Sequence, residues 1–250
     1  MRQQVVSWFV VGDFGGVTMR VMIEAVLVGR VAPLASTGKP SGIDKSASAG
    51  PVRIGFEGLD GDEQADRRNH GGPEKAVHHY PLDHAPAWRA DLPGAPALVE
   101  RPGAFGENLS THGLTEADIC IGDLWRAGTA LLQVSQARQP CWKLNARFGV
   151  TDMAVRVQKT GRTGWYYRII ETGMVGAGDD LALVERAHPD WPLSRLLRVF
   201  YVDRLDRAAL AEIAALPSLS TSWRTLAARR LDKGQVEDWK PRLQGDASTA

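Results

Sequence analysis

The sequence predicts a mainly β fold, in which short strands form a closed or nearly closed barrel with a few short helices, followed by a C-terminal unit of three helices. Short segments rich in β-branched and aromatic residues recur between Val21 and Val184. Glycine-rich turns separate them, as is typical of barrels built from many short strands. After Asp190, apolar residues recur at helical spacing instead.

The expected strands are short and bounded by turn residues. Gly128 and Thr129 separate two of them, which is the spacing of a two-residue hairpin. We expect strands at Val21–Val31, Val52–Phe56, Leu124–Ala127, Ala130–Ser135, Trp165–Ile170 and Leu181–Val184.

Short helices are expected between these strands. Pro81–Ala90 has proline in its first turn, where the missing N–H costs nothing. Cys141–Phe148 and Asp152–Lys159 follow, and Thr151 is a candidate cap for the second of them.

The C-terminal region is expected to form helices at Leu193–Tyr201, Arg207–Ala215 and Ser220–Leu231. A unit of about fifty residues has only a marginal core of its own, so it is expected to dock on the barrel or on a partner. The predicted divisions are residues 1–20, an N-terminal extension of unknown role, residues 21–188, the barrel, and residues 189–245, the three-helix unit.

Composition excludes some classes of protein. The 250 residues carry 30 Lys and Arg against 29 Asp and Glu, so nothing suggests binding to a nucleic acid polymer or to a membrane surface. The apolar run Val5–Val11 is too short to span a bilayer. Two cysteines, Cys120 and Cys141, with no CxxC pair indicate a reduced cytoplasmic protein with free thiols.

One polar, glycine-rich segment stands out at Asp66–Tyr80. Gly71 and Gly72 allow close approach of the backbone to a ligand, and Arg68 and Lys75 beside them favour an anion. A charged surface turn that leads into a strand would explain the same residues equally well.

Three further segments are polar where a fold alone would not require it. In Phe105–Leu109, Glu107 and Asn108 could orient a histidine or a ligand, although a solvated turn explains them better when taken alone. Gly161–Tyr166 is a basic turn or simply a hairpin. In Gln139–Asn145, Cys141 opens an expected helix whose positive end, together with Lys143, would favour the thiolate. A buried, inert cysteine is the commoner alternative.

In combination and in this order, these segments resemble the MOSC family, named for the C-terminal domain of molybdenum-cofactor sulfurase, and within it the YiiM-like branch. The resemblance runs from about residue 22 to residue 243 and leaves the first twenty residues outside it. The segments that carry it are GKPSGIDKS (38–46), GLDGDEQAD (58–66), HGGPEKAVHHYP (70–81), FGENLST (105–111), GLTEADICIGD (113–123), QVSQARQPCWKLN (133–145) and GRTGWYYRI (161–169).

The resemblance implies a MOSC-type β-barrel that binds molybdenum cofactor (molybdopterin). Relatives in this branch are associated with the reduction of small N-hydroxylated compounds such as 6-hydroxylaminopurine. Cys141 matches the family cysteine that would ligate molybdenum, and a soft thiolate suits such a centre. Because the chain has no flavin or iron–sulfur motif, a separate electron-donor protein is expected. Monomer and homodimer both remain open.

Roles for the other candidate residues follow from the resemblance as hypotheses. Arg68, Lys75 and Arg162 would hold the phosphate or pterin edge of the cofactor, with Asn69, Gly71, Gly72 and Lys143 beside them. His79 and Asn145 would orient the Cys141 sulfur or a substrate, and His70 would deliver a proton. Glu107 and Asn108 would recognise substrate or fix a histidine tautomer. Structural roles are expected for His78, His84, His112, His188 and Cys120.

Two other functions remain open. The chain could be a non-catalytic carrier that holds the cofactor, or a sulfur atom, on Cys141. Less favoured is a cysteine hydrolase with a Cys141–His79 pair, which requires the two side chains within hydrogen-bond reach.

Overall fold

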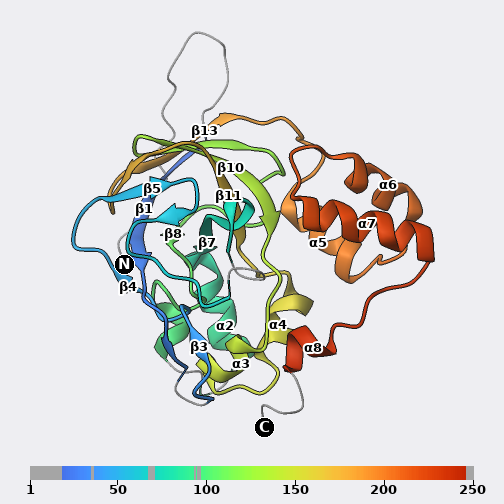
Figure 1. Ribbon diagram of the computed structural model, residues 1–250, viewed down its shortest axis with the longest axis horizontal. Helices are drawn as coiled ribbons and strands as arrows, with labels where there is room; N and C mark the ends of the chain where they lie inside the picture. Colours follow the sequence, from blue (N-terminus) through green and yellow to red (C-terminus); the bar gives the residue numbers. More distant parts are fainter. Residues whose placement is uncertain (1–18, 35–36, 67–70, 93, 95–96, 246–250) are drawn as a thin grey trace.

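The architecture comes from a computed structural model that describes residues 19–34, 37–66, 71–92, 94 and 97–245. Seven strands of the described chain form a ring in the order β13–β9–β10–β11–β7–β8–β1, and β1 pairs with β13 to close it (Figure 1). Only β7 and β8 run parallel in this ring. The seven are β1 (Arg20–Val28), β7 (Val77–Pro81), β8 (Leu109–Thr111), β9 (Leu124–Ala127), β10 (Ala130–Ala137), β11 (Trp165–Glu171) and β13 (Asp180–Glu185). The predicted β-barrel is confirmed.

Several short strands and turns lie outside the seven-stranded ring. β4 (Ser46–Ala47) pairs with β1, β2 (Ala32–Pro33) pairs with β3 (Pro40–Ser41), and β5 (Val52–Gly55) lies between β6 (Gly58–Leu59) and β12 (Gly173–Val175). Single 3-10 turns occur at η1 (Pro73–Lys75), η2 (Leu82–His84) and η3 (Ala97–Glu100).

The predicted hairpin at Gly128–Thr129 joins β9 to β10. Gly128 has a φ of 54°, and a Cβ atom there would lie 2.3 Å from the carbonyl oxygen of Met174. Glycine therefore satisfies both the turn and the close approach of the neighbouring chain.

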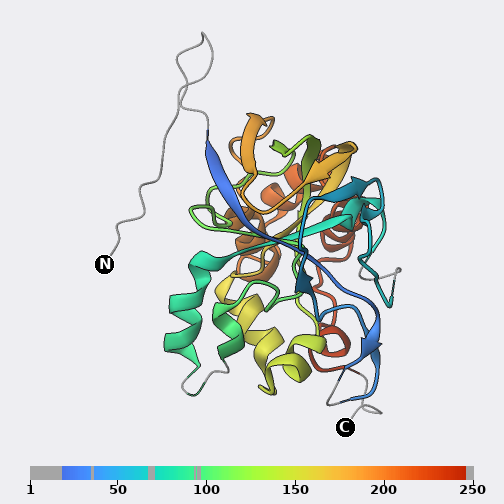
Figure 2. The same cartoon turned by 90° about the vertical axis from the view of Figure 1, so that its left-hand side faces the viewer.

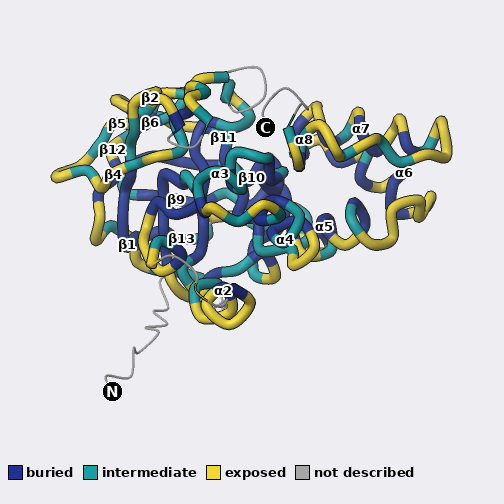
Figure 3. The backbone as a smooth tube through the Cα atoms, turned by 90° about the horizontal axis from the view of Figure 1, so that it is seen from below, coloured by how far each residue is buried: buried dark blue, intermediate teal, exposed yellow. Residues whose placement is uncertain are grey.

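The predicted C-terminal helices are confirmed as α5 (Leu193–Tyr201), α6 (Arg207–Ala215) and α7 (Thr221–Lys233). Apolar side chains of these helices, among them Leu196 and Phe200, join those of the barrel, such as Trp125 and Trp165, in one continuous core. The helices therefore dock on the barrel, and their outer faces are exposed, whereas barrel strands such as β10 are mostly buried (Figure 3). No helix in the described parts of the chain is long and apolar enough to cross a bilayer.

A fourth helix, α8 (Lys240–Gln244), was not predicted. It follows a segment that returns from the three-helix unit to the barrel, where it lies beside α4 (Met153–Thr160) (Figure 1).

A second apolar cluster lies below the barrel, among α2 (Ala85–Asp91), α3 (Lys143–Phe148) and α4 (Figure 2). Its centre is a stack of Tyr80 on Phe105, with ring centroids 3.9 Å apart. Thr151 does not cap α4, contrary to prediction. The side-chain oxygen of Asn145 instead accepts the N–H of Ala154, 2.7 Å away.

The return segment is anchored by an ion pair within the C-terminal unit. Arg230 is 1% exposed and donates to both carboxylate oxygens of Glu237, which also accepts from the Trp239 indole. Burial by itself would raise the pKa of Glu237, but the hydrogen bonds from Arg230 and Trp239 outweigh it and lower the pKa to about 2. The folded state therefore favours the carboxylate.

We predict that Glu237→Gln lowers the free energy of unfolding at pH 7 by about 2 kcal/mol, because it leaves the buried Arg230 charge without its counterion. The stabilisation from Glu237 is complete above its ordinary pKa of 4.5 and is lost as the pH falls to about 2. Urea unfolding of both proteins across this range should show the difference shrinking. Glu212→Gln, which removes an exposed partner of Arg195, is the control and should change stability by less than about 0.5 kcal/mol. A constant difference at every pH would contradict this assignment.

Candidate functional site

Cys141 is 7% exposed and lines two adjoining pockets, here called the narrow and the wide compartment. The narrow compartment, of about 70 Å³, reaches into the side of the barrel and is lined by residues such as His78, Asn108 and Arg138. The wide compartment, of about 550 Å³, opens between Lys39, Trp142 and α8. Its volume is within the range of small-molecule sites. Lys75, Lys143 and Tyr166 line both compartments.

The C-terminal helix α8 holds the segment around Cys141 in place. The carbonyl oxygen of Arg242 accepts the N–H of Trp142, 2.8 Å away, and its guanidinium donates to the carbonyl of Pro140 and to the side chain of Gln158. Arg242 therefore holds the peptide groups on both sides of the cysteine. Cys141 directly precedes Trp142, the N-cap residue of α3, so the helix begins two residues later than predicted and the cysteine lies just before its N-terminus.

A buried ion pair forms one wall of the narrow compartment. The Lys45 ammonium contacts the Asp62 carboxylate, and the two side chains are 6% and 1% exposed. Burial lowers the pKa of Lys45, while Asp62 acts in the opposite direction. Asp62 also accepts from the Gly29 N–H and from the Asn108 amide, at 3.0 and 2.9 Å. The Lys45 charge is thus largely compensated within the protein.

Arg138 contributes a charge that the protein compensates less. It follows β10, is 6% exposed and donates to the Tyr166 hydroxyl, whose pKa is raised mainly by burial. Its Nη1 atom is buried and has no hydrogen-bond partner. A buried guanidinium N–H without an acceptor is costly, and a ligand with an anionic oxygen would satisfy it.

Strand alternation separates the adjacent histidines of β7. His78 pairs with Tyr166 across β7 and β11, their rings are 4.9 Å apart, and both line the narrow compartment. His79 pairs with Trp165, with ring centroids 4.3 Å apart, and lines neither compartment. Burial and the nearby Arg138 charge hold the pKa of His78 well below its ordinary value, so its ring is neutral at pH 7.

The predicted role of His79 beside Cys141 is wrong. Its two ring nitrogens are bonded to the Tyr167 and Thr111 hydroxyls, at 3.0 and 2.9 Å, and burial lowers its pKa to about 3. A His79 that is buried in the barrel and fully bonded cannot activate the Cys141 thiol, which removes the cysteine hydrolase hypothesis.

Several other predicted residues act elsewhere. Glu107 is fully buried, has a pKa raised by burial, and accepts from the Gly103 and Phe105 N–H groups and the Ser110 hydroxyl. It therefore stabilises its own loop and lines neither compartment. Asn145 caps α4 and donates to the carbonyl of Leu243, 3.0 Å away, so both ends of its amide are used structurally.

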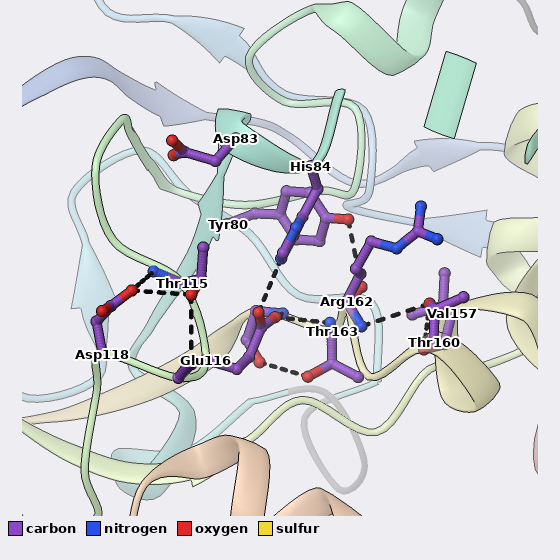
Figure 4. Close-up of polar contacts among 12 residues, drawn as sticks. Tyr80, Asp83, His84, Thr115, Glu116, Asp118, Val157, Thr160, Arg162 and Thr163 are labelled. Atoms are coloured by element: carbon purple, nitrogen blue, oxygen red, sulfur yellow. Dashed lines mark hydrogen bonds and ion pairs between the residues drawn. The ribbon is translucent and has the colours of Figure 1, made fainter. Parts of the chain in front are cut away.

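Arg162 lies in a different part of the molecule. Its guanidinium stacks on Trp88, 4.1 Å from the ring centroid, and pairs with Asp91. Figure 4 shows its neighbours: the Tyr80 hydroxyl donates to the Arg162 carbonyl, and Glu116 binds the backbone of Thr163. Arg162 lines neither compartment around Cys141, so the predicted cofactor contact is wrong.

The loop predicted to bind an anion is described only in part. Arg68, Asn69 and His70 lie outside the described residues. Gly71 and Gly72 do not line either compartment, but the Gly72 carbonyl accepts the N–H of Lys75 and so shapes the turn that carries this lysine into the pocket. Burial lowers the pKa of Lys75, and Glu74 acts against that shift.

Of the predicted residues, the pocket brings together Cys141, Lys75, Asn108 and Lys143. The Lys143 ammonium also donates to the carbonyl of Pro40, 3.2 Å away. Sequence reasoning missed the lining residues Lys45, Asp62, His78, Gln136, Arg138 and Tyr166. All six lie within the segments that carry the family resemblance, so that resemblance was the available signal.

No group of three or more His, Cys, Asp or Glu side chains suited to a metal occurs among the described residues. A metal bound by the Cys141 sulfur would therefore need further ligands from a cofactor.

Comparison with known proteins decides the family. The MOSC domain family model matches residues 66–182, and the YiiM-like 3-alpha helix domain model matches residues 191–234. Protein YiiM of Escherichia coli is 43% identical over 209 residues, which cover 83% of this chain and 92% of that protein. The chain belongs to the MOSC family.

Two further similarities place it within the family. The crystal structure of YiiM from Escherichia coli superposes on this MOSC chain with a TM-score of 0.76 and 34% identity, and covers 91% of this chain and 100% of that one. A protein of Gibberella moniliformis named Reductase is 42% identical over 178 residues, which cover 71% of this chain and 31% of that protein. The YiiM-like branch is thus shown for both the barrel and the C-terminal helices.

We predict that Arg242→Ala loosens the Cys141 segment, because it removes the bonds from the guanidinium to Pro140 and Gln158. Alkylation of Cys141 by iodoacetamide at pH 7, followed by mass spectrometry of its peptide, should become several-fold faster, with a loss of stability of about 2 kcal/mol. Lys240→Ala, at an exposed position in the same helix, is the control. Equal alkylation rates in Arg242→Ala and the native protein would show that α8 does not hold the cysteine.

Proposed function

We propose that this protein is a molybdenum-cofactor oxidoreductase that reduces N-hydroxylated compounds such as 6-hydroxylaminopurine to the corresponding amines. The observation that carries the proposal is the position of Cys141, at the junction of two pockets beside the buried Arg138. Membership of the MOSC family, and the name Reductase of one relative, support the same chemistry.

The residues present fit the proposed cofactor. The Cys141 sulfur is a soft ligand suited to molybdenum. Arg138 Nη1, in the narrow compartment, and the Gln136 side-chain oxygen, in the wide one, are buried without hydrogen-bond partners, so a donor and an acceptor are available to polar groups of a cofactor. Lys75 and Lys143 add positive charge beside them. Arg138 would bind an anionic oxygen of the cofactor, and Gln136 would accept an N–H from its pterin.

The proposed reaction breaks the N–O bond of a hydroxylamine. Two electrons and two protons convert R–NHOH to R–NH₂ and water, and the electrons come from a separate electron-donor protein. When bound, the molybdenum cofactor supplies this two-electron, oxygen-removing chemistry.

The chain's own residues would orient the substrate and control charge. Because His78 is neutral at pH 7, the positive charge of the narrow compartment comes from Arg138 and the lysines. The rings of His78 and Tyr166, tilted by 32° with centroids 4.9 Å apart, offer aromatic surface against which a planar heterocycle could pack. The predicted proton donor, His70, remains a prediction.

A carrier that holds the cofactor or a persulfide sulfur on Cys141 is the alternative. It uses the same cysteine but predicts no turnover of hydroxylamines. Molybdenum or persulfide sulfur on Cys141 in a protein that does not reduce 6-hydroxylaminopurine, even with a competent donor, would favour the carrier.

We predict that protein purified from a host that makes molybdenum cofactor contains molybdenum, and that Cys141→Ala loses both the metal and the reduction of 6-hydroxylaminopurine. Metal content is measured by elemental analysis and turnover by chromatography of the amine product. The matched control is Cys120→Ala. That thiol is buried, burial raises its pKa to about 11, and it contacts the Pro189 carbonyl. Full activity of metal-free protein would overturn the proposal.

We predict that Arg138→Met weakens retention of molybdenum by about tenfold or more, because a charged hydrogen bond contributes about 1.5–3 kcal/mol. The readout is the molybdenum-to-protein ratio after graded dilution and gel filtration. Arg126→Met removes an exposed pair with Glu171 and serves as the matched control. Unchanged retention in Arg138→Met would remove this residue from the cofactor site.

A further inference from the structure

A second cleft, separate from the Cys141 pocket, lies between the barrel and the three-helix unit. It has a volume of about 670 Å³, and it shares no lining residue with either compartment around Cys141. Its walls come from the loop at Thr115–Ala117, from α4, from α5, from Trp239 of the return segment and from Leu243 of α8. Neither family model contains this cleft as a whole, because residues 66–182 and 191–234 each supply only part of it.

The charge of this cleft is positive. Four of its lining residues are cationic, namely Lys159, Arg162, Arg198 and Arg204. Arg162 pairs with Asp91 and Arg198 with Asp203, neither of which lines the cleft, so the carboxylates that pair with these two lie outside its walls. Its carboxylate, Glu116, is already bonded on both oxygens. One accepts from the Thr163 and Gly164 N–H groups at 2.8 and 2.7 Å, and the other contacts the His84 ring at 2.8 Å (Figure 4). Both Glu116 oxygens are therefore occupied, and no ion pair joins this carboxylate to the four cations in the described structure.

Arg162 provides an unused donor. Its Nη2 atom pairs with Asp91, and the face of its guanidinium packs on Trp88. These contacts hold the group rigidly, and its side chain is only 16% exposed. Its Nη1 atom is nevertheless buried and has no hydrogen-bond partner in the described structure. A preorganised guanidinium with a free N–H favours an anionic acceptor over water.

The remaining walls are apolar and aromatic. Leu197 and Tyr201 of α5 line the cleft together with Trp239 and with Leu243 of α8. The Tyr201 and Trp239 rings pack edge to face, with centroids 5.7 Å apart. A cleft lined by both cationic and aromatic or apolar side chains suits a ligand with an anionic group and a flat or apolar body. A simple inorganic anion would use only the cations.

We propose that this cleft binds a small organic anion with an aromatic or apolar body, whose carboxylate, sulfonate or phosphate is held by Arg162. The site is independent of the proposed function at Cys141, since no lining residue is common to the two. Two observations support the proposal. Arg162 has a buried N–H without a hydrogen-bond partner, and cationic and apolar residues from both units of the fold line the same cleft.

The test uses 8-anilinonaphthalene-1-sulfonate as the probe and the full chain as the protein. N-phenyl-1-naphthylamine has the same aromatic body without the sulfonate and is the matched ligand. Ser194→Trp places a large side chain in the cleft from an exposed position of α5, and Arg162→Gln removes the proposed anion donor. Thr225→Trp and Arg229→Gln make the same changes at exposed positions of α7 outside the cleft. Thermal unfolding shows that each variant is folded.

We expect the sulfonate to bind the native protein at one site and more tightly than the amine. Arg162→Gln should weaken its binding by about tenfold, the effect of losing one charged hydrogen bond. Ser194→Trp should weaken it by at least about tenfold because its side chain occupies the cleft, whereas the α7 controls bind normally. If Arg162→Gln does not fold, Ser194→Trp still tests the cleft, because its substitution is at an exposed position. A further variant, Lys143→Gln, changes the Cys141 pocket instead of the cleft. Equal affinity of Ser194→Trp and native protein, or loss of binding only in Lys143→Gln, would show that the probe binds outside the cleft and would overturn the proposal.

Discussion

The functional chemistry of this protein depends on the alternation of side chains along β7 and β11. Two adjacent residues on a strand point to opposite faces, so His78 and Tyr166 reach the pocket while His79 and Trp165 fill the barrel. The inner face supplies the packed core, which excludes water. The outer face can then hold polar groups whose surroundings are rigid.

The buried charges that line the pocket differ in how completely they are hydrogen-bonded. Lys45 and Asp62 neutralise each other, with Asn108 and Gly29 completing the hydrogen bonds of the carboxylate. Arg138 is equally buried but keeps one donor without a partner. The fully bonded charge pair and the arginine with an unused donor therefore differ here in their bonding and not in their depth.

The fold could be predicted from the sequence more completely than the site. The hairpin at Gly128, the strands β9 and β11 and the three C-terminal helices are local patterns, and the structure contains all of them. β8 has three residues, too few to show a pattern, and α8 is set by contacts with distant segments. Of the predicted site residues, Cys141, Lys75, Asn108 and Lys143 line the pocket. His79 and Arg162 lie elsewhere, because the alternation of side chains along a strand and long-range packing decide which way a side chain points.

Because the chain returns to the barrel through α8, the structural unit of this protein is longer than the segments that match the two family models. The helix that follows the 191–234 match supports the peptide groups beside Cys141, and β1, which precedes the 66–182 match, closes the ring. A minimal fragment must therefore extend from Arg20 through Leu243 to retain both supports. For the same reason, a fusion partner is better joined through a linker placed beyond Gly245 than in place of α8.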